Sequence, residues 1–426
     1  MHSDGEAGAA AFDLVVVGLG YVGLPLVVEA VRAGLTVVGL DTDPSRVAQL
    51  RAGRSPITDL SGDELQALLA AGFAVTTDPA CLARAAAAVV CVPTPLAEDG
   101  TPELSAVVGA MSAVGDHLHP GMLVVLESTT YPGTTEQVVA PLLEERSGLQ
   151  PGCDFAYSPE RIDPGNARFG LRTTPKVVGG LTEACADRAE QLYGKLVDQV
   201  VRVRGTREAE MTKLLENTYR HVNIALVNEM AVFFHELGID LWAVIDAAET
   251  KPFGFAAFRP GPGVGGHCIP VDPSYLSWAV RRLGYPFRFV ELAQEVNARM
   301  PAYVVQRITA ALNDRSKAVR GSRVLLVGIT YKADVADDRE TPAEPLARTL
   351  RELGAELHWH DPHLSSFSPG GTTLPRATDL LEAAAASDLV VLLQAHSSYD
   401  LDALAAAAPL LLDTRGVAAG PHVERL

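Results

Sequence analysis

The stretch that decides the fold of this chain is Gly18-Leu-Gly-Tyr-Val-Gly23. It follows an apolar run over Asp13–Val17 that predicts a strand, and it precedes a helical pattern over Leu24–Ala33. In a strand–turn–helix unit the first glycine allows the tight turn, and the second lets the backbone approach a pyrophosphate. The third permits close packing of the helix on the strand. The stretch therefore predicts a dinucleotide site.

An acidic residue follows the next predicted strand, Thr36–Leu40. Asp41 lies about twenty residues beyond the glycines, where a carboxylate bonds the ribose 2′-hydroxyl of a dinucleotide. Such an acid would repel a 2′-phosphate, so the sequence favours NAD over NADP. The alternative is that the glycines only shape a turn and that Asp41 only caps a helix together with Asp43. The order of strand, glycine turn, helix and acid favours the dinucleotide site.

The fingerprint opens a block, from about Phe12 to Arg204, in which strand-like runs alternate with helical patterns. This alternation predicts a parallel, doubly wound α/β sheet. A block from about Arg320 onward repeats the alternation, but its first turn, Gly328–Ala333, lacks the glycine pattern, so we expect a different ligand there. The predicted strands are Leu14–Gly18, Thr36–Leu40, Ala88–Val92, Leu123–Glu127, Lys176–Gly179, Val324–Val327, Glu356–Trp359, Leu389–Leu393 and Leu410–Leu412.

The segment between the two blocks is helical. No glycine or proline occurs over Glu208–Leu237, which predicts one long helix ended by Gly238. Such a helix is long enough to support a dimer interface.

Composition narrows the class of protein. The chain has 426 residues, of which 48% are hydrophobic and 20% charged, as in a soluble enzyme of two or three domains. The net charge of −17 argues against a general nucleic-acid or anionic-membrane surface. The five cysteines show neither paired nor metal-like spacing, which fits a reducing compartment and predicts no metal site. Residues 1–11 resemble a flexible end without a signal peptide, and no apolar run predicts a membrane span, so we expect a cytoplasmic protein.

The segment Gly261–Asp272 carries the candidate chemistry. It places the thiol of Cys268 four residues before the carboxylate of Asp272, among glycines and prolines that fix the turns. A cysteine beside a nicotinamide can hold an aldehyde as a thiohemiacetal, allow its oxidation to a thioester and release an acid. His267 could lower the pKa of this thiol or only pack in the loop. A buried, inert cysteine is the alternative reading.

Two further groups are candidates. Lys213, Asn217 and His221 are spaced by four residues and share one face of the long helix, as a solvated polar stripe or as groups that stabilise an oxyanion and position a water. Glu160 follows a short aromatic strand and could act as a general base. The alternative is a surface ion pair between Glu160 and Arg161.

Together these motifs resemble the nucleotide-sugar dehydrogenase family over roughly residues 12–416. The resemblance implies a four-electron oxidation of a sugar C6 alcohol to a carboxylate, with two NAD reduced. It also implies an N-terminal Rossmann NAD-binding domain (12–204), a central helical domain with the cysteine loop (205–318) and a C-terminal Rossmann-like domain for the UDP-sugar (319–426). The motifs are Gly18–Pro25, Cys91–Pro95, Glu127–Gly133, Ser158–Arg161, Lys213–Asn217, Gly265–Asp272 and Gly328–Asp334.

Roles for individual residues follow from the same resemblance. Cys268 is the covalent nucleophile and Glu160 the general base of thioester hydrolysis. The residues implied for the oxyanions and the water are Lys213, Asn217, Asp272 and Thr129. The residues expected at the cofactor are Gly18, Gly20, Tyr21, Val22, Gly23, Asp41, Pro93, Thr94, Thr129 and Arg339. The residues expected at the substrate are Glu160, Arg161, Lys213, Asn217, Arg259, Gly265 and Lys332, with Arg259 acting in its own or a neighbouring subunit. Family members form dimers or larger assemblies through the central helices.

The choice of sugar depends on a few positions. Members that act on UDP-glucose usually read Gly-Gly-Ser-Cys-Phe-Pro-Lys-Asp at the nucleophile, whereas this chain has His267 and Val271. These residues resemble the branch acting on UDP-N-acetylhexosamines. Lys251–Phe255 and Tyr275–Trp278 resemble the UDP-N-acetylglucosamine members more than the UDP-N-acetylmannosamine members, although the latter sugar and UDP-glucose remain alternatives.

Two other classes of protein are alternatives. A two-electron β-hydroxyacid dehydrogenase shares the first domain and a helical middle, but it needs neither Cys268 nor a second βαβ-type domain. A protein that binds NAD or a UDP-sugar without catalysis would be expected to lack Cys268, Lys213 or Asp272, and all three are present.

Overall fold

The computed structural model describes residues 11–57, 60–97, 99–149, 155–163, 165–166, 168–266 and 268–426, and for Cys268 it describes the backbone alone. The predicted flexible end, apart from Ala11, lies outside these residues. The chain divides into two compact units. The first comprises Met1–Glu216 and Ser274–Leu283, and the second Asn217–Pro273 and Gly284–Leu426.

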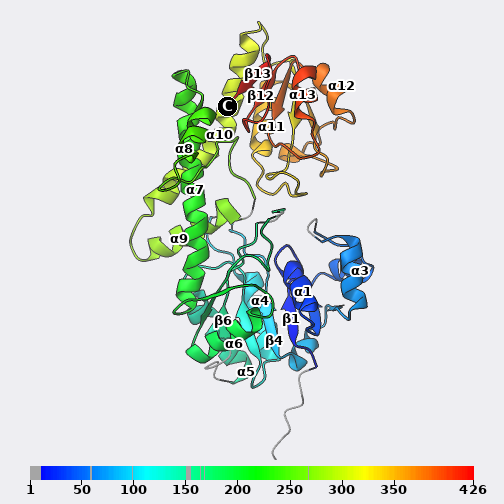
Figure 1. The fold of residues 1–426 in the computed structure, drawn as a ribbon, viewed down its shortest axis with the longest axis vertical. Coiled ribbons are helices and arrows are strands. Elements are labelled where there is room, and N and C mark those ends of the chain that lie inside the picture. Colours follow the sequence, from blue (N-terminus) through cyan, green and yellow to red (C-terminus); the bar gives the residue numbers. More distant parts are fainter. Residues whose placement is uncertain are drawn as a thin grey trace, which may run out of the picture. The chain divides into compact units, whose positions relative to one another are not determined.

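The first unit contains an eight-stranded sheet (Figure 1) with the order β3-β2-β1-β4-β5-β6-β7-β8. All neighbouring strands are parallel except β6 and β7, which are antiparallel. The predicted parallel, doubly wound sheet is therefore confirmed except at this pair, where the described residues between β6 and β7 form no crossover helix. The strands are β1 Leu14–Val17, β2 Val37–Leu40, β3 Ala74–Thr76, β4 Ala87–Val90, β5 Leu123–Leu126, β6 Phe155–Tyr157, β7 Lys176–Gly180 and β8 Val200–Arg202.

Helices cover both faces of this sheet. One core contains Leu14 and Val16 of β1, and the opposite core contains Val15 and Val17. Because both faces are buried, the strands are continuous apolar runs instead of alternating ones. The first core is covered by α1 Gly23–Arg32, α2 Pro44–Arg51, α3 Gly62–Ala70 and α6 Glu183–Tyr193. The second core is covered mainly by α4 Ser105–Asp116 and α5 Ala140–Ser147, with the 3-10 helix η1 Pro79–Arg84 and the π-helix η2 Thr135–Val139.

The predicted long helix is confirmed as α7, Thr206–Glu236, which contributes residues to both units. The second unit also holds α8 Leu241–Glu249, the first residues of α9 Cys268–Arg282, and α10 Arg288–Asn313. Each described helix is too short or too polar to cross a membrane.

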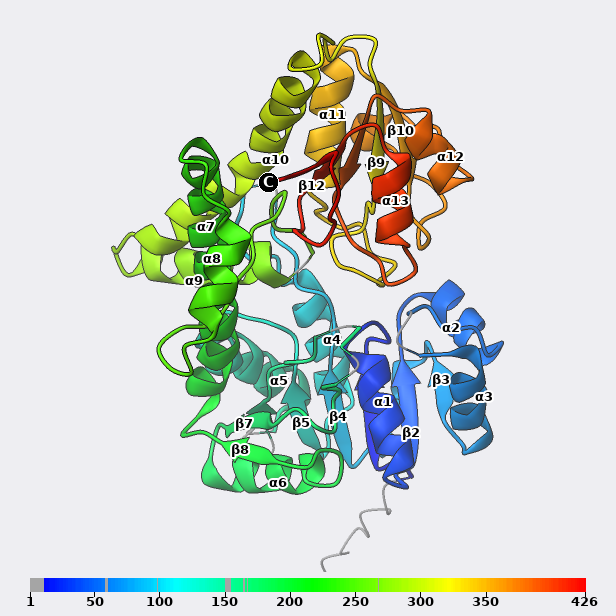
Figure 2. The ribbon, with the colours of Figure 1, turned by 45° about the horizontal axis from the view of Figure 1, so that its top comes forward.

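A five-stranded parallel sheet, of order β10-β9-β11-β12-β13, forms the rest of the second unit. Helices α10 and α11 pack side by side on one face (Figure 2), and α12 and α13 cover the other. This confirms the second βαβ-type domain. The elements are β9 Arg323–Val327, α11 Ala343–Leu353, β10 Glu356–His360, η3 Pro369–Gly371, α12 Leu380–Ala385, β11 Leu389–Leu392, α13 Leu401–Ala407, β12 Leu411–Asp413 and β13 Val423–Arg425.

Candidate functional site

Five predicted site residues lie at the carboxyl edge of the first sheet. Strands β2, β1, β4, β5 and β6 are parallel neighbours, so the segments that follow them meet at one edge. The residues in these segments are Asp41, Gly18, Thr94, Thr129 and Glu160, respectively. The chain order reverses between β1 and β4, and ligands of doubly wound sheets bind in the crevice at such a switch point.

The glycine turn fits a dinucleotide. Gly18 has a φ of +94°, and a Cβ there would lie 2.6 Å from the carbonyl oxygen of Cys91. A Cβ on Gly23 would lie 1.9 Å from the carbonyl oxygen of Gly18, whereas a Cβ on Gly20 would meet nothing within 4 Å. Helix α1 begins at Gly23, and no side chain caps its first turn at Val22. Bare backbone and uncapped N–H groups are what a pyrophosphate requires.

Asp41 is held against this turn. Its buried carboxylate accepts hydrogen bonds from the backbone N–H of Leu19, at 2.9 Å, and of Asp43, at 3.0 Å, and it pairs with Arg46 at 3.2 Å. The cap of α2 is Asp43, which accepts from the backbone N–H of Ser45. Helix capping therefore does not explain Asp41, whose position beside the glycine turn suits a ribose hydroxyl. Of the other predicted cofactor residues here, Tyr21 and Val22 are half-buried and Pro93 is exposed.

Glu160 is buried and lies beside a cation that the sequence reasoning missed. Its Oε2 is 3.7 Å from Nζ of Lys176, a buried lysine at the start of β7. Its Oε1 accepts a hydrogen bond from the backbone N–H of Ile162. Arg161 instead pairs with Glu216, at 2.5 Å. The alternative of a surface ion pair between Glu160 and Arg161 is therefore wrong.

Lys176 also belongs to a wider buried cluster. Its Nζ lies 3.0 Å from Oε1 of Glu127, which accepts a hydrogen bond from the Tyr193 hydroxyl, and Oε2 of Glu127 is 3.9 Å from the Cys91 sulfur. Burial raises the pKa of Glu127, against the lowering effect of Lys176. Burial, together with the charge of Glu127, raises the pKa of both Cys91 and Tyr193 well above their usual values. Cys91 is thus a neutral, buried thiol beside the pair of Glu127 and Lys176.

A second missed residue, Glu210, binds the turn that follows Thr129. Its fully buried carboxylate accepts hydrogen bonds from the backbone N–H of Gly133, at 2.5 Å, and from the N–H and hydroxyl of Thr135, at 2.8 and 2.6 Å. Burial raises the pKa of Glu210 to about 7. Glu210 lies one helical turn before Lys213 on α7, so it joins the Thr129 turn to the helix that carries Lys213.

In the second unit, two predicted catalytic residues touch. Nδ2 of Asn217 on α7 donates a hydrogen bond to Oδ2 of Asp272, at 2.5 Å, and Asp272 is buried. Asp272 lies four residues after Cys268, the first residue of α9. The side chain of Cys268 and the whole of His267 lie outside the described residues. The structure thus brings Asn217 to the segment that begins with the predicted nucleophile.

The glycine loop before Cys268 packs on the turn after β9. The backbone N–H of Gly266 donates to the carbonyl of Arg339, at 3.0 Å, and a Cβ on Gly265 would lie 2.7 Å from Cβ of Tyr331. At the start of the loop, the N–H of Gly261 donates to Oδ1 of Asn228, at 2.9 Å. The loop therefore needs glycine for close contact, and it lies against the segment that contains Lys332 and Arg339.

Other predicted residues have different surroundings. His221 is buried, and burial lowers its pKa to about 4, so it is neutral. Because Lys213 is buried too, the prediction of a solvated polar stripe on α7 is wrong.

Arg259, a predicted substrate residue, pairs with Asp246 and Glu249 of α8, at 2.8 and 3.2 Å. Among the described residues, Arg259 thus forms ion pairs with these two carboxylates and with no predicted site residue.

Among the described residues, one group of histidine and aspartate side chains could hold a metal ion, and it lies beside the five-stranded sheet of the second unit. Asp334, His363 and His396 place their ligand atoms within 4.8 Å of one another. However, Nδ1 of His396 accepts the backbone N–H of Asp334, at 3.0 Å, and its Nε2 bonds Asp361, at 2.9 Å. His396 therefore has no nitrogen left for an ion. Arg339 pairs with Asp337 in the same turn.

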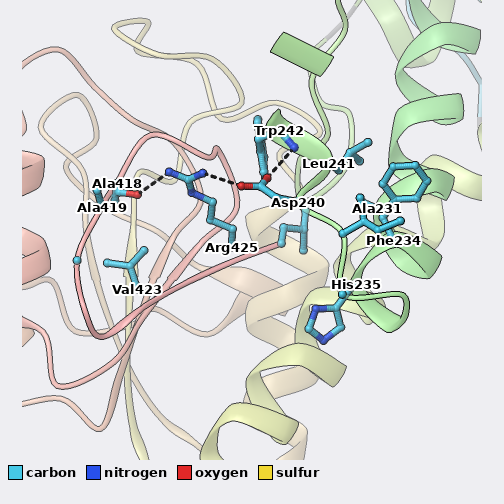
Figure 3. Close-up of a pocket in the computed structure, with 14 residues that line it drawn as sticks. Ala231, Phe234, His235, Asp240, Leu241, Trp242, Ala418, Ala419, Val423 and Arg425 are labelled. Carbon is cyan, nitrogen blue, oxygen red and sulfur yellow. Dashed lines mark hydrogen bonds and ion pairs between the residues drawn. The ribbon is translucent and has the colours of Figure 1, made fainter. Parts of the chain in front are cut away.

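A cavity of about 460 Å³ lies in the second unit between the end of α7, the start of α8 and residues 418–426 (Figure 3). Arg425 bridges it, with Nη1 3.5 Å from the Asp240 carboxylate and Nη2 donating to the carbonyl of Ala418. Among the described residues that line this cavity, none is a predicted site residue.

The missed residues carried weak signals. Lys176 is a charged residue at the start of an apolar run, and such a residue in a buried strand requires a partner. Glu127 ends a similar run, and Glu210 precedes Lys213 by three residues. In each case the sequence marks a charged residue as unusual, but it does not show which residue that side chain contacts.

The chain is similar to several known proteins. Three domain descriptions of one family match: "UDP-glucose/GDP-mannose dehydrogenase family, NAD binding domain" at residues 12–197, "central domain" at 207–299 and "UDP binding domain" at 325–420. A UDP-N-acetyl-D-glucosamine 6-dehydrogenase of Pseudomonas aeruginosa is 38% identical over 91% of both chains. A UDP-N-acetyl-D-mannosamine dehydrogenase of Methanococcus maripaludis is 34% identical over 91% of this chain and 86% of its own. The solved structure of a UDP-D-ManNAc dehydrogenase from Pyrococcus horikoshii has a TM-score of 0.88 at 31% identity, covering 97% of this chain and 98% of its own.

Proposed function

Since this chain belongs to the UDP-glucose/GDP-mannose dehydrogenase family, an NAD-dependent group of nucleotide-sugar dehydrogenases, we propose that it converts UDP-N-acetylglucosamine to the corresponding uronate. One C6 alcohol, one water and two NAD⁺ give one carboxylate, two NADH and three protons. The observation that supports this most is the contact of Asn217 with Asp272 on the helix that begins at Cys268. It joins the long helix to the segment of the proposed nucleophile.

The glycine turn and Asp41 would hold NAD, which would supply the hydride acceptor for each of the two oxidations. The Cys268 thiolate adds to the C6 aldehyde, which forms the C–S bond of a thiohemiacetal and, after the second oxidation, of a thioester. The first turn of a helix favours a negative charge, and Cys268 is the first residue of α9.

Hydrolysis of the thioester needs a base and donors for an oxyanion. Glu160 takes a proton from water, the resulting hydroxide attacks the carbonyl carbon, and the C–S bond breaks to return the Cys268 thiolate. Lys213 and Asn217 donate hydrogen bonds to the oxyanion in our proposal. Asp272 orients the Asn217 amide, to which it is bonded.

The choice of an N-acetylated sugar depends on the nucleophile segment and on relatives. Val271 is a buried residue of α9, at the position where UDP-glucose members usually carry lysine. Curated relatives from Pseudomonas aeruginosa and Salmonella typhi are named UDP-N-acetyl-D-glucosamine 6-dehydrogenase. UDP-N-acetylmannosamine is the second candidate, because the Methanococcus maripaludis and Pyrococcus horikoshii proteins are named for that sugar.

We also propose a homodimer formed through α7. Tyr219, Leu226 and Phe233 recur every seven residues on this helix, and they are 52%, 54% and 43% exposed. Leu237, just beyond the helix, is 65% exposed. Apolar residues at this spacing form one stripe along a helix, which a second copy can cover.

The test is a panel assay of the purified protein with NAD. We expect two NADH, followed at 340 nm, for each molecule of UDP-N-acetylglucosamine, and a product heavier by the change from CH₂OH to COOH. Cys268→Ser should bind NAD but form no acid. Turnover of only UDP-N-acetylmannosamine or UDP-glucose would contradict the sugar, and acid formation by Cys268→Ser would contradict the covalent route.

A further inference from the structure

The buried cluster that contains Glu160 carries an unbalanced charge. It contains two carboxylates, Glu127 and Glu160, and one ammonium, Lys176, all of them buried. The cluster has a net charge of −1 when both carboxylates are ionised. Uptake of one proton makes it neutral, and buried charge is costly unless it is balanced.

We propose that Lys176 and Glu127 are positioning residues that set how readily Glu160 takes up a proton. The inference rests on the proposed function, in which Glu160 is the general base of thioester hydrolysis. The positive charge of Lys176 favours the carboxylate form of the neighbouring Glu160, and the negative charge of Glu127 favours its acid form. The two residues therefore act with opposite sign on proton transfer from water to Glu160.

Of the two carboxylates, Glu160 is the more exposed, and it has an oxygen that accepts no hydrogen bond within the described residues, as suits a group that exchanges a proton with water. Lys176 lies 3.0 Å from Glu127 but 3.7 Å from Glu160, and the Tyr193 hydroxyl also donates to Glu127. Oε2 of Glu160 accepts no hydrogen bond within the described part of the chain. Glu160 is also 6% exposed, against 1% for Glu127.

Other groups around Glu160 do not reverse this balance. Cys91 and Tyr193 are neutral, because burial raises the pKa of each well above its usual value. Arg161 is paired with Glu216 of α7. Lys213, the buried cation of α7, is present in all of the variants below and does not alter their comparison.

The test is the acid limb of the pH profile of thioester hydrolysis, measured in single turnovers with the UDP-sugar that the panel selects. Lys176→Met leaves two unbalanced carboxylates and should move the limb to higher pH. Glu127→Gln leaves one carboxylate balanced by Lys176 and should move it to lower pH. Each shift should be on the order of one pH unit, as for neighbouring charges in a protein interior. Lys176→Arg keeps the positive charge and should leave the acid limb close to its wild-type pH. Lys195→Met, a change at an exposed lysine, should leave the position of the limb unchanged.

A purely structural role would lower the rate of both variants without moving their limbs in opposite directions. Shifts of the same sign, or no shift, overturn the inference. Glu127→Gln changes one atom and keeps the test informative if Lys176→Met does not fold. Glu160→Gln separates the two claims. If it keeps the wild-type limb, the proposed base is wrong; if it stops acid formation while the other limbs stay in place, only the inference fails.

Discussion

Replacement of Glu210 by glutamine should remove a pH-dependent loss of stability from the first unit. The carboxylate is fully buried, and the pKa of Glu210 is raised to about 7 because burial outweighs its hydrogen bonds to Gly133 and Thr135. In the unfolded chain the group titrates near its ordinary value of 4.5. The folded state therefore holds the proton more tightly than the unfolded state.

The sign follows from linkage. A group with a raised folded-state pKa stabilises the protein fully below the unfolded pKa, and this contribution is lost as the pH rises through the folded pKa. For a change from 4.5 to about 7, the loss between about pH 5 and pH 8 amounts to about 2.5 kcal/mol. Glutamine cannot ionise and escapes this loss. Glu210→Gln should therefore gain about 2.5 kcal/mol relative to wild type over that range.

The assay is native-state hydrogen exchange of peptides from β4 and β5, which reports the unfolding free energy of the first unit. Wild type and Glu210→Gln are compared at both pH values, with Glu208→Gln, an exposed glutamate of the same helix, as the control. The control should show no pH-dependent difference. A difference between Glu210→Gln and wild type that is flat with pH would refute the raised pKa. A difference of the opposite sign would show that the hydrogen bonds outweigh burial.

Three further predictions concern ligands and assembly. Gly23→Ala should weaken NAD by at least about tenfold, roughly 1.4 kcal/mol, since its Cβ would lie 1.9 Å from the carbonyl oxygen of Gly18; calorimetry with UDP should show no change. Asp41→Ala should weaken NAD far more than the UDP-sugar, and equal weakening of both would contradict its ribose role. Phe233→Lys should convert the proposed dimer to a monomer in light scattering, whereas lysine in place of the exposed Arg220 should not.

The sequence alone determined the elements whose signals are local. The glycine turn, the apolar strands and the long helix α7 each depend on neighbouring residues, so their pattern predicted both the α/β class and the dinucleotide site. Asp41 was predictable because its distance from the glycine turn is set by one βαβ unit.

Only the tertiary structure decided which charged groups meet. The reversal between β6 and β7 brings Lys176 beside Glu160, and the order of the sheet adds Glu127, the residue that follows β5. Glu210 reaches a turn more than seventy residues earlier in the chain. These contacts depend on how elements that are distant in the sequence pack together. In a different packing, the same charged side chains would be exposed to solvent. The sequence therefore indicated the groups that could perform the chemistry, whereas the packing determined which of them share a proton or hold a turn.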